Sequence, residues 1–381
     1  GEAQPGSLTS AEVSARMAEI AGRFPQLATV EKFGISAGGR PLEVLRIGDF
    51  ALPPENPQRP LTFLLVGTQH GMEPSGGEAL LRLAAELVAE GKTGQRLNGA
   101  RYLLVPNLNP DGRDRNRRVN GAKVNLSTDF TLLTQPESQA LVRLLEYWGP
   151  DVVLDLHESA IWKKQSLGAQ GYLLDFEAQF EVANHPGIAP PLRDLGFTKL
   201  LPEVIAATQA AGLPAQRYIG EITRLDQVLV HGGLSLRNLR NYAGMRGIAS
   251  FLVENRLDPS NGTYPTPRNI QERVRKQGVA LKAFLQVCLK HGAEIRTATA
   301  AARQADLDPQ AWPLPGAAEY APQPGMEKRQ VTLRRIADGQ PEALTSSIQL
   351  AIGSRGIPFT PVPSRPSITR VFQSRSSAVS C

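Results

Sequence analysis

Short runs of apolar residues recur along the chain and give its strongest structural signal. The runs are LTFLLVG (61–67), RYLLVP (101–106), DVVLDL (151–156) and IASFLVE (248–254). Each run is continuous rather than alternating, which is typical of a strand buried on both faces of a sheet. Two further segments, ATVEKFG and LEVLRIG, flank the glycine-rich turn SAGGRP and predict a pair of strands ahead of the first run.

Segments with a helical repeat of apolar positions alternate with these strands. They cover residues 11–24, 78–91, 138–148 and 268–290. Strands that alternate with helices predict an α/β domain, with a mixed, largely parallel central sheet and helices on both of its faces. We expect this domain to cover residues 1–295.

The composition changes after residue 295. Residues 296–325 include PQAWPLPG and YAPQPG, which predict a proline-rich linker. Residues 326–381 contain two strand-like segments, RQVTLRRI and SSIQLAI, followed by the polar stretch SITRVFQSRSSAVSC. We therefore expect a small β-rich C-terminal appendage that ends in an irregular tail.

The overall composition is ordinary for a globular protein, with 381 residues, 41% hydrophobic and 20% charged. No apolar run approaches the roughly 18 residues that span a bilayer, so we expect no membrane span. Cys288 lies in a helical pattern and Cys381 is the last residue, which predicts a buried thiol and a tail thiol rather than a disulfide.

Charge and the N-terminal segment bear on partners and location. The net charge is +6, which permits anionic partners without requiring them. The basic run RDRNRR (113–118) is short and has no aromatic platform beside it, so no nucleic-acid partner is expected. The first ten residues lack a secretory pattern. The protein is thus expected to be periplasmic or secreted if a signal peptide was removed, and cytoplasmic otherwise.

Histidine and glutamate residues, which can bind a metal or carry a proton, follow or end three of the predicted strands. His70 and Glu73 come just after the strand at 61–67, His157 directly follows the strand at 151–156, and Glu254 ends the last strand. In open α/β sheets, binding sites form at the carboxyl ends of the strands. Residues far apart in the sequence are therefore expected to meet at one edge of the sheet.

Two imidazoles and one carboxylate are a common ligand set for a catalytic Zn²⁺, with a fourth position open to water. His70, Glu73 and His157 would supply that set for one ion, and Glu254 would move the proton between water and leaving nitrogen. Each residue also has an ordinary interpretation. His70 and His157 would then be hydrogen-bonded polar groups, and Glu254 would be an ion-pair partner of Arg256.

Five stretches carry these residues and further motifs between residues 10 and 290. In chain order they are FGISAGGRPLEVLRIG, GTQHGMEPSGGEALL, VPNLNPDGRDRNRRVNGAKVNLSTDF, QPESQALVRLLEYWGPDVVLDLHES and RNYAGMRGIASFLVENR. In this order they resemble the zinc metallocarboxypeptidases, the carboxypeptidase A-like funnelins. The resemblance implies that His70, Glu73 and His157 bind Zn²⁺, that Glu254 is the general base and acid, and that Arg118 polarises the scissile carbonyl. Arg118 is otherwise part of a solvated basic loop.

One stretch departs from the family pattern. The usual family sequence there contains an Asn-Arg pair that clamps a terminal carboxylate, and Ser127 and Thr128 replace it here. A hydroxyl cannot make the bidentate charged contact that an arginine makes with carboxylate. Asn125 replaces the Asp that would orient the first histidine, and Asp155 is a second candidate for that supporting role.

The stretch LSLRNLRNYAGMRG (234–247) precedes the Glu254 strand, and the resemblance implies that it lines the substrate pocket. Arg237 and Arg240 would favour an acidic group on the substrate, as in cell-wall stem peptides or N-acyl acidic amino acids. Tyr242 would cover the bound substrate, or alternatively would be a packed aromatic residue.

These observations favour a zinc-dependent, carboxypeptidase-like metallopeptidase that hydrolyses peptide bonds. Two alternatives stay open. A zinc deacylase or amidase acting on small N-acyl amino acids would use the same metal ligands without a terminal carboxylate clamp. A non-catalytic binding protein on the same scaffold would also explain the loss of the Asn-Arg pair.

Overall fold

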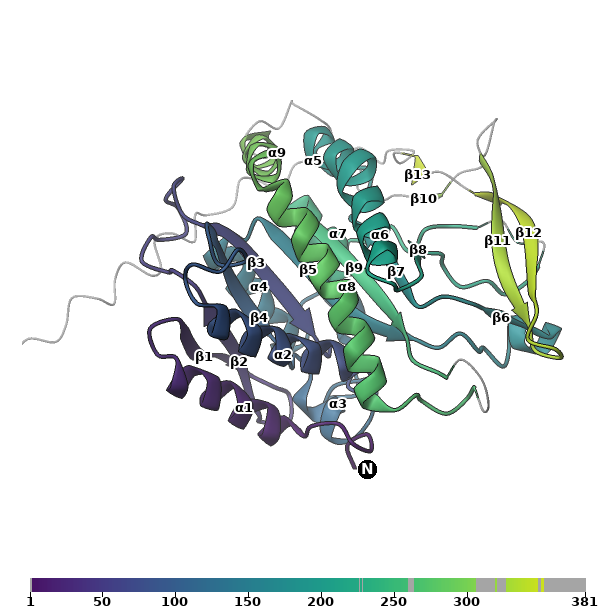
Figure 1. Cartoon of the computed structure of the whole chain (residues 1–381), viewed down its shortest axis with the longest axis horizontal. Coiled ribbons are helices and arrows are strands. Elements are labelled where there is room, and N and C mark those ends of the chain that lie inside the picture. The colour runs from purple at the N-terminus through teal and green to yellow at the C-terminus, as the bar shows by residue number, and fades with distance from the viewer. Residues whose placement is uncertain are drawn as a thin grey trace, which may run out of the picture.

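A computed structural model describes residues 2–225, 227, 229–259, 264–305, 319–320, 327–348 and 351–352 (Figure 1). Its centre is a twisted eight-stranded sheet in this part of the chain. The strands in spatial order are β1 (Ala28–Ile35), β2 (Pro41–Ile47), β4 (Ala100–Val105), β3 (Leu61–Gly67), β5 (Val152–Ser159), β9 (Ala249–Arg256), β7 (Ala178–Val182) and β8 (Ala215–Arg217).

The four central strands run parallel to one another. β3 pairs in parallel with both β4 and β5, and β5 pairs in parallel with β9. The flanking strands β2 and β7 run antiparallel to this group, and β1 pairs antiparallel with β2. The prediction of a mixed, largely parallel sheet is therefore confirmed. Because β3, β5 and β9 point the same way, their carboxyl ends meet at one edge.

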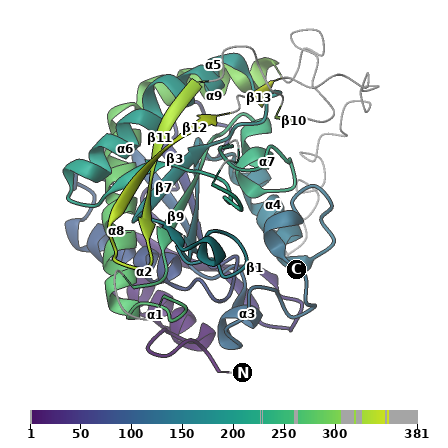
Figure 2. The same cartoon turned by 90° about the vertical axis from the view of Figure 1, so that its right-hand side faces the viewer.

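Helices cover both faces of the sheet, as Figure 2 shows. Two helices cover one face, and they are α4 (Pro136–Trp148) and α7 (Leu239–Met245). The helices on the opposite face are α1 (Ser10–Arg23), α2 (Ser75–Glu90), α5 (Pro190–Leu195), α6 (Leu201–Ala210), α8 (Ile270–Lys290) and α9 (Gly292–Ala305). Short helical segments lie in the loops: α3 (Pro110–Asp114), η1 (Leu126–Thr128), η2 (Leu167–Gln170) and η3 (Gly196–Leu200).

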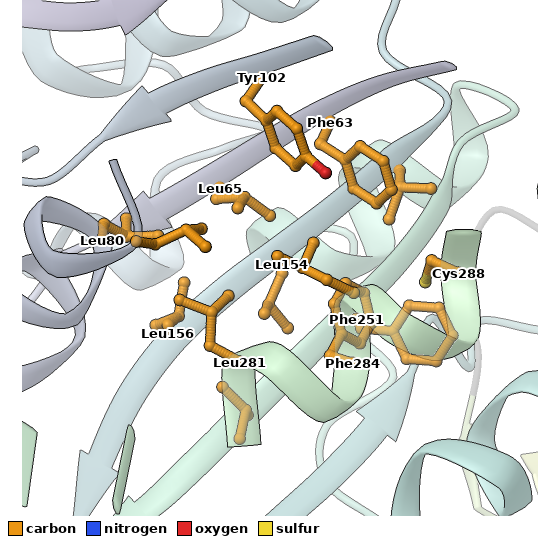
Figure 3. Packing of buried hydrophobic residues seen from close by; sticks show 14 of the residues in the cluster. Phe63, Leu65, Leu80, Tyr102, Leu154, Leu156, Phe251, Leu281, Phe284 and Cys288 are labelled. Carbon is orange, nitrogen blue, oxygen red and sulfur yellow. The ribbon is translucent and has the colours of Figure 1, made fainter. Parts of the chain in front are cut away.

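The continuous apolar strands are explained by this two-sided cover. Leu65 and Leu154 face the cluster beneath α2 and α8, whereas their neighbours Leu64 and Val153 face the cluster beneath α4 and α7. Figure 3 shows the first of these clusters, in which Cys288 packs among apolar side chains. Burying one Leu or Phe side chain contributes about 1.5–3 kcal/mol, so both layers stabilise the strands that carry the polar residues.

Two boundaries differ from the predicted domain division. Residues 296–305 belong to helix α9 and not to the linker predicted over 296–325. The sequence there is rich in alanine and has no proline before Pro309, and Ile295, Ala298 and Ala302 bury one face of the helix against the domain. Residues 306–318 and 321–326 of the predicted linker lie outside the described residues.

The appendage predicted over 326–381 is joined to the main domain by strand pairing. β11 (Glu327–Arg335) and β12 (Pro341–Ile348) form a hairpin, and β11 also pairs with β6 (Tyr172–Leu174). A second small ladder joins β10 (Glu319–Tyr320) to β13 (Ala351–Ile352). The tail predicted over the last fifteen residues, SITRVFQSRSSAVSC with Cys381, lies outside the described residues. Cys288 is a buried free thiol. No described helix could cross a membrane.

Candidate metal centre

Three potential metal ligands meet at the carboxyl ends of β3 and β5. One ligand atom each from His70, Glu73 and His157 lies within 4.8 Å of the others, and all three side chains are buried. His70 Nδ1 lies 2.8 Å from Glu73 Oε1 and 3.3 Å from His157 Nδ1. His157 Nδ1 lies 3.1 Å from Glu73 Oε2. The expected convergence of distant residues is therefore found.

The opposite nitrogen of each imidazole has an oxygen partner. His70 Nε2 lies 3.1 Å from Asn125 Oδ1, and His157 Nε2 lies 2.8 Å from Asp155 Oδ2. Gln69 donates to the same Asp155 oxygen at 2.7 Å. An Nε2–H that donates to such an oxygen leaves the Nδ1 lone pair directed at the shared point, which is how supporting residues orient metal-bound histidines.

Glu73 is held in place by backbone and charge. The Glu158 amide donates to Glu73 Oε2 at 3.1 Å. Burial by itself would raise the pKa of Glu73, but His70 and His157 more than offset it and hold the pKa well below its usual range. Burial lowers the pKa of His157, and the Asp155 and Glu73 carboxylates more than compensate and raise it.

The loop that carries His70 needs a strained and crowded backbone. Thr68 adopts a φ of 58°, which costs a non-glycine residue about 1–2 kcal/mol. Its hydroxyl donates to the Pro106 carbonyl and accepts from Arg113, which offsets that cost. A Cβ at Gly71 would come within 1.9 Å of the Gly112 carbonyl carbon, so position 71 requires glycine.

Two sequence motifs without catalytic chemistry support this loop. Asn109 of the N-P-D-G motif caps α3 by accepting from the Gly112 amide at 2.8 Å, and it donates to the Gln69 carbonyl at 2.9 Å. Asp111 accepts from the Gly38 amide and from Arg40 of the S-A-G-G-R turn. These contacts explain why both motifs accompany the predicted ligands.

A buried ion pair next to His157 was not predicted from the sequence. Arg273 of α8 binds both oxygens of Glu158, with Nε–Oε1 at 2.7 Å and Nη2–Oε2 at 2.9 Å. The Ser75 amide at the start of α2 also donates to Glu158. An acidic residue directly after a candidate ligand, in a run that is otherwise apolar, is the signal that could have indicated it.

Glu254 lies on β9 in register with His157 on β5. Its side chain is half-buried, its Oε2 is shielded from solvent, and among the described residues this atom has no hydrogen-bond partner. Burial, with Glu73 and Asp155 adding to it, outweighs the opposing effect of His157 and Arg118 and raises the pKa of Glu254 to about 7. A carboxyl group with such a pKa can accept a proton and return it near neutral pH.

A cavity of about 170 Å³ opens onto this cluster. Five residues of its lining, besides the two imidazoles, were expected: Arg118, Ser127, Asp155, Arg240 and Glu254. The other lining residues were not assigned from the sequence. They are Tyr218, Gly232, Gly233, Asn238 and Leu252, and all but Leu252 come from loops that have no periodic pattern.

Three of the expected substrate contacts lie outside the cavity lining. The Tyr242 hydroxyl donates to Glu146 of α4 at 3.1 Å, because α7 turns this side chain toward that helix. Arg237 donates to the Thr128 carbonyl at 2.7 Å, and the Thr128 hydroxyl donates to the Asn125 carbonyl. None of these three side chains belongs to the cavity lining, and their role in substrate binding stays a prediction.

Arg118 reaches the cluster from the basic loop. Its Nη1 lies 3.6 Å from Glu73 Oε1, and its side chain is 52% exposed. The guanidinium therefore lies at the cavity mouth, between the buried carboxylate and solvent. This position allows it to contact both the cluster and a molecule that enters the cavity.

The fold and the cluster together define an α/β protein with a two-histidine, one-carboxylate site at the carboxyl edge of its sheet. Residues 13–130 match the sequence profile of the zinc carboxypeptidase family, and this stretch includes His70, Glu73 and Arg118. This part of the chain is therefore similar to the zinc carboxypeptidase family, in agreement with the resemblance in its motifs.

Individual relatives agree with that assignment. Carboxypeptidase 2 of Trichophyton rubrum is 26% identical over 268 residues, which are 68% of this chain and 48% of the relative. Carboxypeptidase E of Caenorhabditis elegans is 36% identical over 109 residues, 27% of this chain and 22% of the relative. The chain spans about half of the length of this Carboxypeptidase 2 and about a fifth of the length of this Carboxypeptidase E.

Solved structures of low sequence identity share the fold. A metallo-carboxypeptidase from Burkholderia cenocepacia superposes with a TM-score of 0.54 at 18% identity, and covers 74% of this chain and 69% of its own. The carboxypeptidase A from Helicoverpa armigera gives a TM-score of 0.56 at 17% identity, and covers 75% of each chain. These likenesses concern the arrangement of sheet and helices.

Proposed function

We propose that this protein is a zinc-dependent metallopeptidase that hydrolyses peptide bonds in a carboxypeptidase-like manner. The observation that carries the proposal is the meeting of His70, Glu73 and His157 beside a cavity. That cavity is also lined by a half-buried acid, Glu254, and a cation, Arg118. The relationship to the zinc carboxypeptidases supports it.

The three side chains fit one Zn²⁺. Donor atoms around a tetrahedral zinc at about 2.0–2.1 Å are separated by about 3.3 Å, and the two Nδ1 atoms here are 3.3 Å apart. Two neutral imidazoles whose lone pairs face a carboxylate repel it unless protons or a metal cation lie between them. When bound, the zinc would lower the pKa of a water molecule from about 15.7 toward 7 and polarise a carbonyl oxygen.

Glu254 is assigned the proton transfers. Its unpartnered Oε2 would accept a proton from the attacking water and deliver it to the leaving amine nitrogen. The pKa raised by burial suits both steps. Arg118 would donate to the oxygen on which negative charge develops, and its guanidinium stays protonated throughout.

The substrate would carry an acidic group. Arg240 lies buried in the cavity wall, donates to the Gly233 carbonyl at 3.0 Å, and adds a second cation to the lining besides Arg118. Ser127 does not replace the missing carboxylate clamp, because its hydroxyl donates to Asn125 at 2.8 Å and lies 3.0 Å from His70 Nε2. We therefore infer acidic peptides, such as cell-wall stem peptides, as the substrate class.

The absence of the Asn-Arg clamp also favours a deacylase as a second candidate function. Ser127 and Thr128 both hydrogen-bond to Asn125, so neither is positioned as a dedicated receptor for a terminal carboxylate. A site without that receptor can accept N-acyl amino acids or internal amides. This second candidate uses the same metal ligands and the same Glu254.

A substrate panel with metal analysis tests the proposal. Protein purified without chelators is assayed for zinc and for cleavage of peptides that end in Ala, Lys or Glu, each with a free or an amidated C-terminus. N-acyl glutamate is included. We expect about one zinc per chain and fastest release of the acidic residue from free peptides. Equal rates on amidated peptides, or cleavage of the N-acyl substrate alone, would favour the deacylase, and no turnover with zinc bound would refute both.

A further inference from the structure

The β11–β12 hairpin lies against the loops that form one wall of the cavity. β11 pairs antiparallel with β6, so that Leu333 lies opposite Leu174 and Arg335 lies opposite Tyr172. The Ile336 amide adds a hydrogen bond to the Gly171 carbonyl at 2.9 Å. In Figure 1 the hairpin lies beside β6, at the end of the molecule away from β1 and β2. Segments far apart in the sequence therefore share one small sheet.

An apolar cluster joins the hairpin to the cavity loops. Its buried members come from η2, from the loop at 218–232 that we call the cavity loop, and from β11, with Tyr172, Leu174 and Leu225 packed around them. Leu333 is fully buried in it. The buried members are Leu167, Ile219, Ile222, Leu229, Val331 and Leu333. The hairpin thus buries apolar surface that the cavity loop would otherwise expose.

The cavity loop has two described segments. Each segment has one residue that lines the cavity and another, close to it in sequence, that packs in the apolar cluster. Tyr218 lines the cavity and the next residue, Ile219, packs in the cluster with the hairpin. On the second segment, Leu229 packs in the cluster and Gly232 lines the cavity. The Gly220 amide donates to the Val230 carbonyl at 2.8 Å and ties the segments together.

A chain of ion pairs links the hairpin to the strand of Glu254. Arg334 of β11 donates to Asp175 Oδ2 at 2.7 Å, and Arg256 donates to Asp175 Oδ1 at 2.8 Å. Arg256 ends β9, two residues beyond Glu254. The hairpin therefore packs on the loop wall and is linked through Asp175 to the strand that carries Glu254, whereas β3, which precedes His70 and Glu73, lies two strands from β9.

We propose that the β11–β12 hairpin positions the wall of the substrate cavity, with Leu333 as its principal positioning residue. Through Ile219 and Leu229 it fixes the loop that presents Tyr218 and Gly232 to the substrate. This inference rests on the proposed function for its kinetic consequence, but not for its structural one. The fit of the substrate therefore depends on residues more than seventy positions after Glu254, and further still from the metal-binding residues.

A pair of substitutions on the same strand tests the proposal in the full-length chain. Leu333→Asp places a charge in the apolar cluster, and Thr332→Asp places the same charge on the exposed face of β11. We expect Leu333→Asp to raise KM about tenfold, with kcat within about twofold and zinc content unchanged, which is the pattern of lost substrate binding. Thr332→Asp is expected to match the unsubstituted protein.

Hydrogen exchange gives a readout that needs no turnover. Leu333→Asp should speed exchange at the Gly220 amide while the amides around His157 keep their protection, and Leu333→Met should restore both KM and protection. Unchanged kinetics and exchange in Leu333→Asp would overturn the proposal, as would equal loss of zinc and of protection throughout. If Leu333→Asp fails to fold, Leu333→Ala is used instead. The same changes in KM and in hydrogen exchange are expected, with smaller magnitude. An inactive parent protein with this exchange pattern would refute the proposed function alone.

Discussion

The metal-facing part of the site and its substrate-facing wall are built in different ways. Around His70 and His157, supporting side chains come from strand ends and from buried polar pairs, such as Glu158 with Arg273. The wall around Tyr218 comes from irregular loops that rest on an apolar cluster. Hydrogen-bonded supports fix the direction of each imidazole, as metal binding requires, whereas the wall is held by the close packing of an apolar cluster.

The largest expected effect is loss of zinc, which depends on the metal-facing part of the site and not on the wall. His157→Ala should reduce zinc content to near zero and abolish hydrolysis, because it removes one of three proposed ligands. His291→Ala, which changes a histidine that contacts Glu203 and Glu294 away from the cavity, should keep both. Metal analysis by mass spectrometry beside a peptide assay measures the difference. Full zinc content in His157→Ala would remove the basis of the comparison.

The next effect concerns chemistry without metal loss. Glu254→Gln should lower kcat/KM about a thousandfold, in the range known for a lost general acid or base, while zinc stays bound. Glu146→Gln, a carboxylate of α4 outside the cavity, should have little effect. Steady-state kinetics on the best acidic peptide gives the ratio. An active Glu254→Gln enzyme would assign the proton transfers to another group.

The supports of the two histidines should differ in strength. Asp155→Asn is expected to weaken zinc affinity about 10–100-fold, and Asn125→Ala less, because only Asp155 places a negative charge on its imidazole. Competition with a chelator at fixed pH measures both. Asp338→Asn, an exposed change in the hairpin, serves as the control. Equal affinities in all three variants would show that these hydrogen bonds do not tune the metal.

A smaller effect tests the wall alone. Arg240→Gln should raise KM about tenfold for peptides that end in Glu and leave neutral peptides unchanged, since it removes one charge-assisted contact. Arg237→Gln is the matched control, because that arginine donates to the Thr128 carbonyl outside the cavity lining. A loss that is equal for acidic and neutral peptides would indicate a structural role for Arg240.

The smallest effect concerns stability and pH beside the wall. Glu177 accepts from Arg268 at two distances of 2.7 Å and from Lys276 at 3.0 Å. Burial alone would raise the pKa of Glu177, and the two cations more than offset it and lower it. Its stabilising effect is therefore present above the unfolded pKa of about 4.5 and is lost as pH falls through the lower folded value.

Glu177→Gln should accordingly destabilise the protein by about 1 kcal/mol at pH 7, a discounted figure for a partly exposed pair. The difference should shrink as the pH approaches 3. Urea unfolding of both proteins across this range measures it, with kinetics at pH 7 as a check that the metal part is unaffected. A difference that grows toward low pH would contradict the assigned sign.

Sequence patterns predicted the metal-facing part far better than the wall. His70, Glu73, His157 and Glu254 stand at the ends of apolar strands, and strand direction alone brings such positions to one edge. Their convergence was predicted, and their roles stay predictions. Tyr218 and Gly232 lie in loops, where neither periodicity nor spacing indicates which way a side chain points.

Tyr242 and Arg237 lie outside the cavity lining for a common physical reason. Tyr242 and Arg237 lie in or next to α7, where a rotation of about 100° per residue separates side chains that face the cavity from those that do not. The segment at 234–247 was predicted as a whole, and only Asn238 and Arg240 from it line the cavity. The extension of the domain to residue 305 and beyond was also missed, because strand pairing over long separations leaves no local trace.

The pairing of β11 with β6 also has a consequence for the order of folding. During synthesis on a ribosome, the segment with His70, Glu73 and His157 emerges well before Leu333, and N-terminal parts of a chain generally fold first. The zinc ligands could thus assemble while β6 still has an open edge, which is a site for wrong pairing. Maturation of this protein would then proceed from ion capture to closure of the wall, with β11 completing the cavity wall.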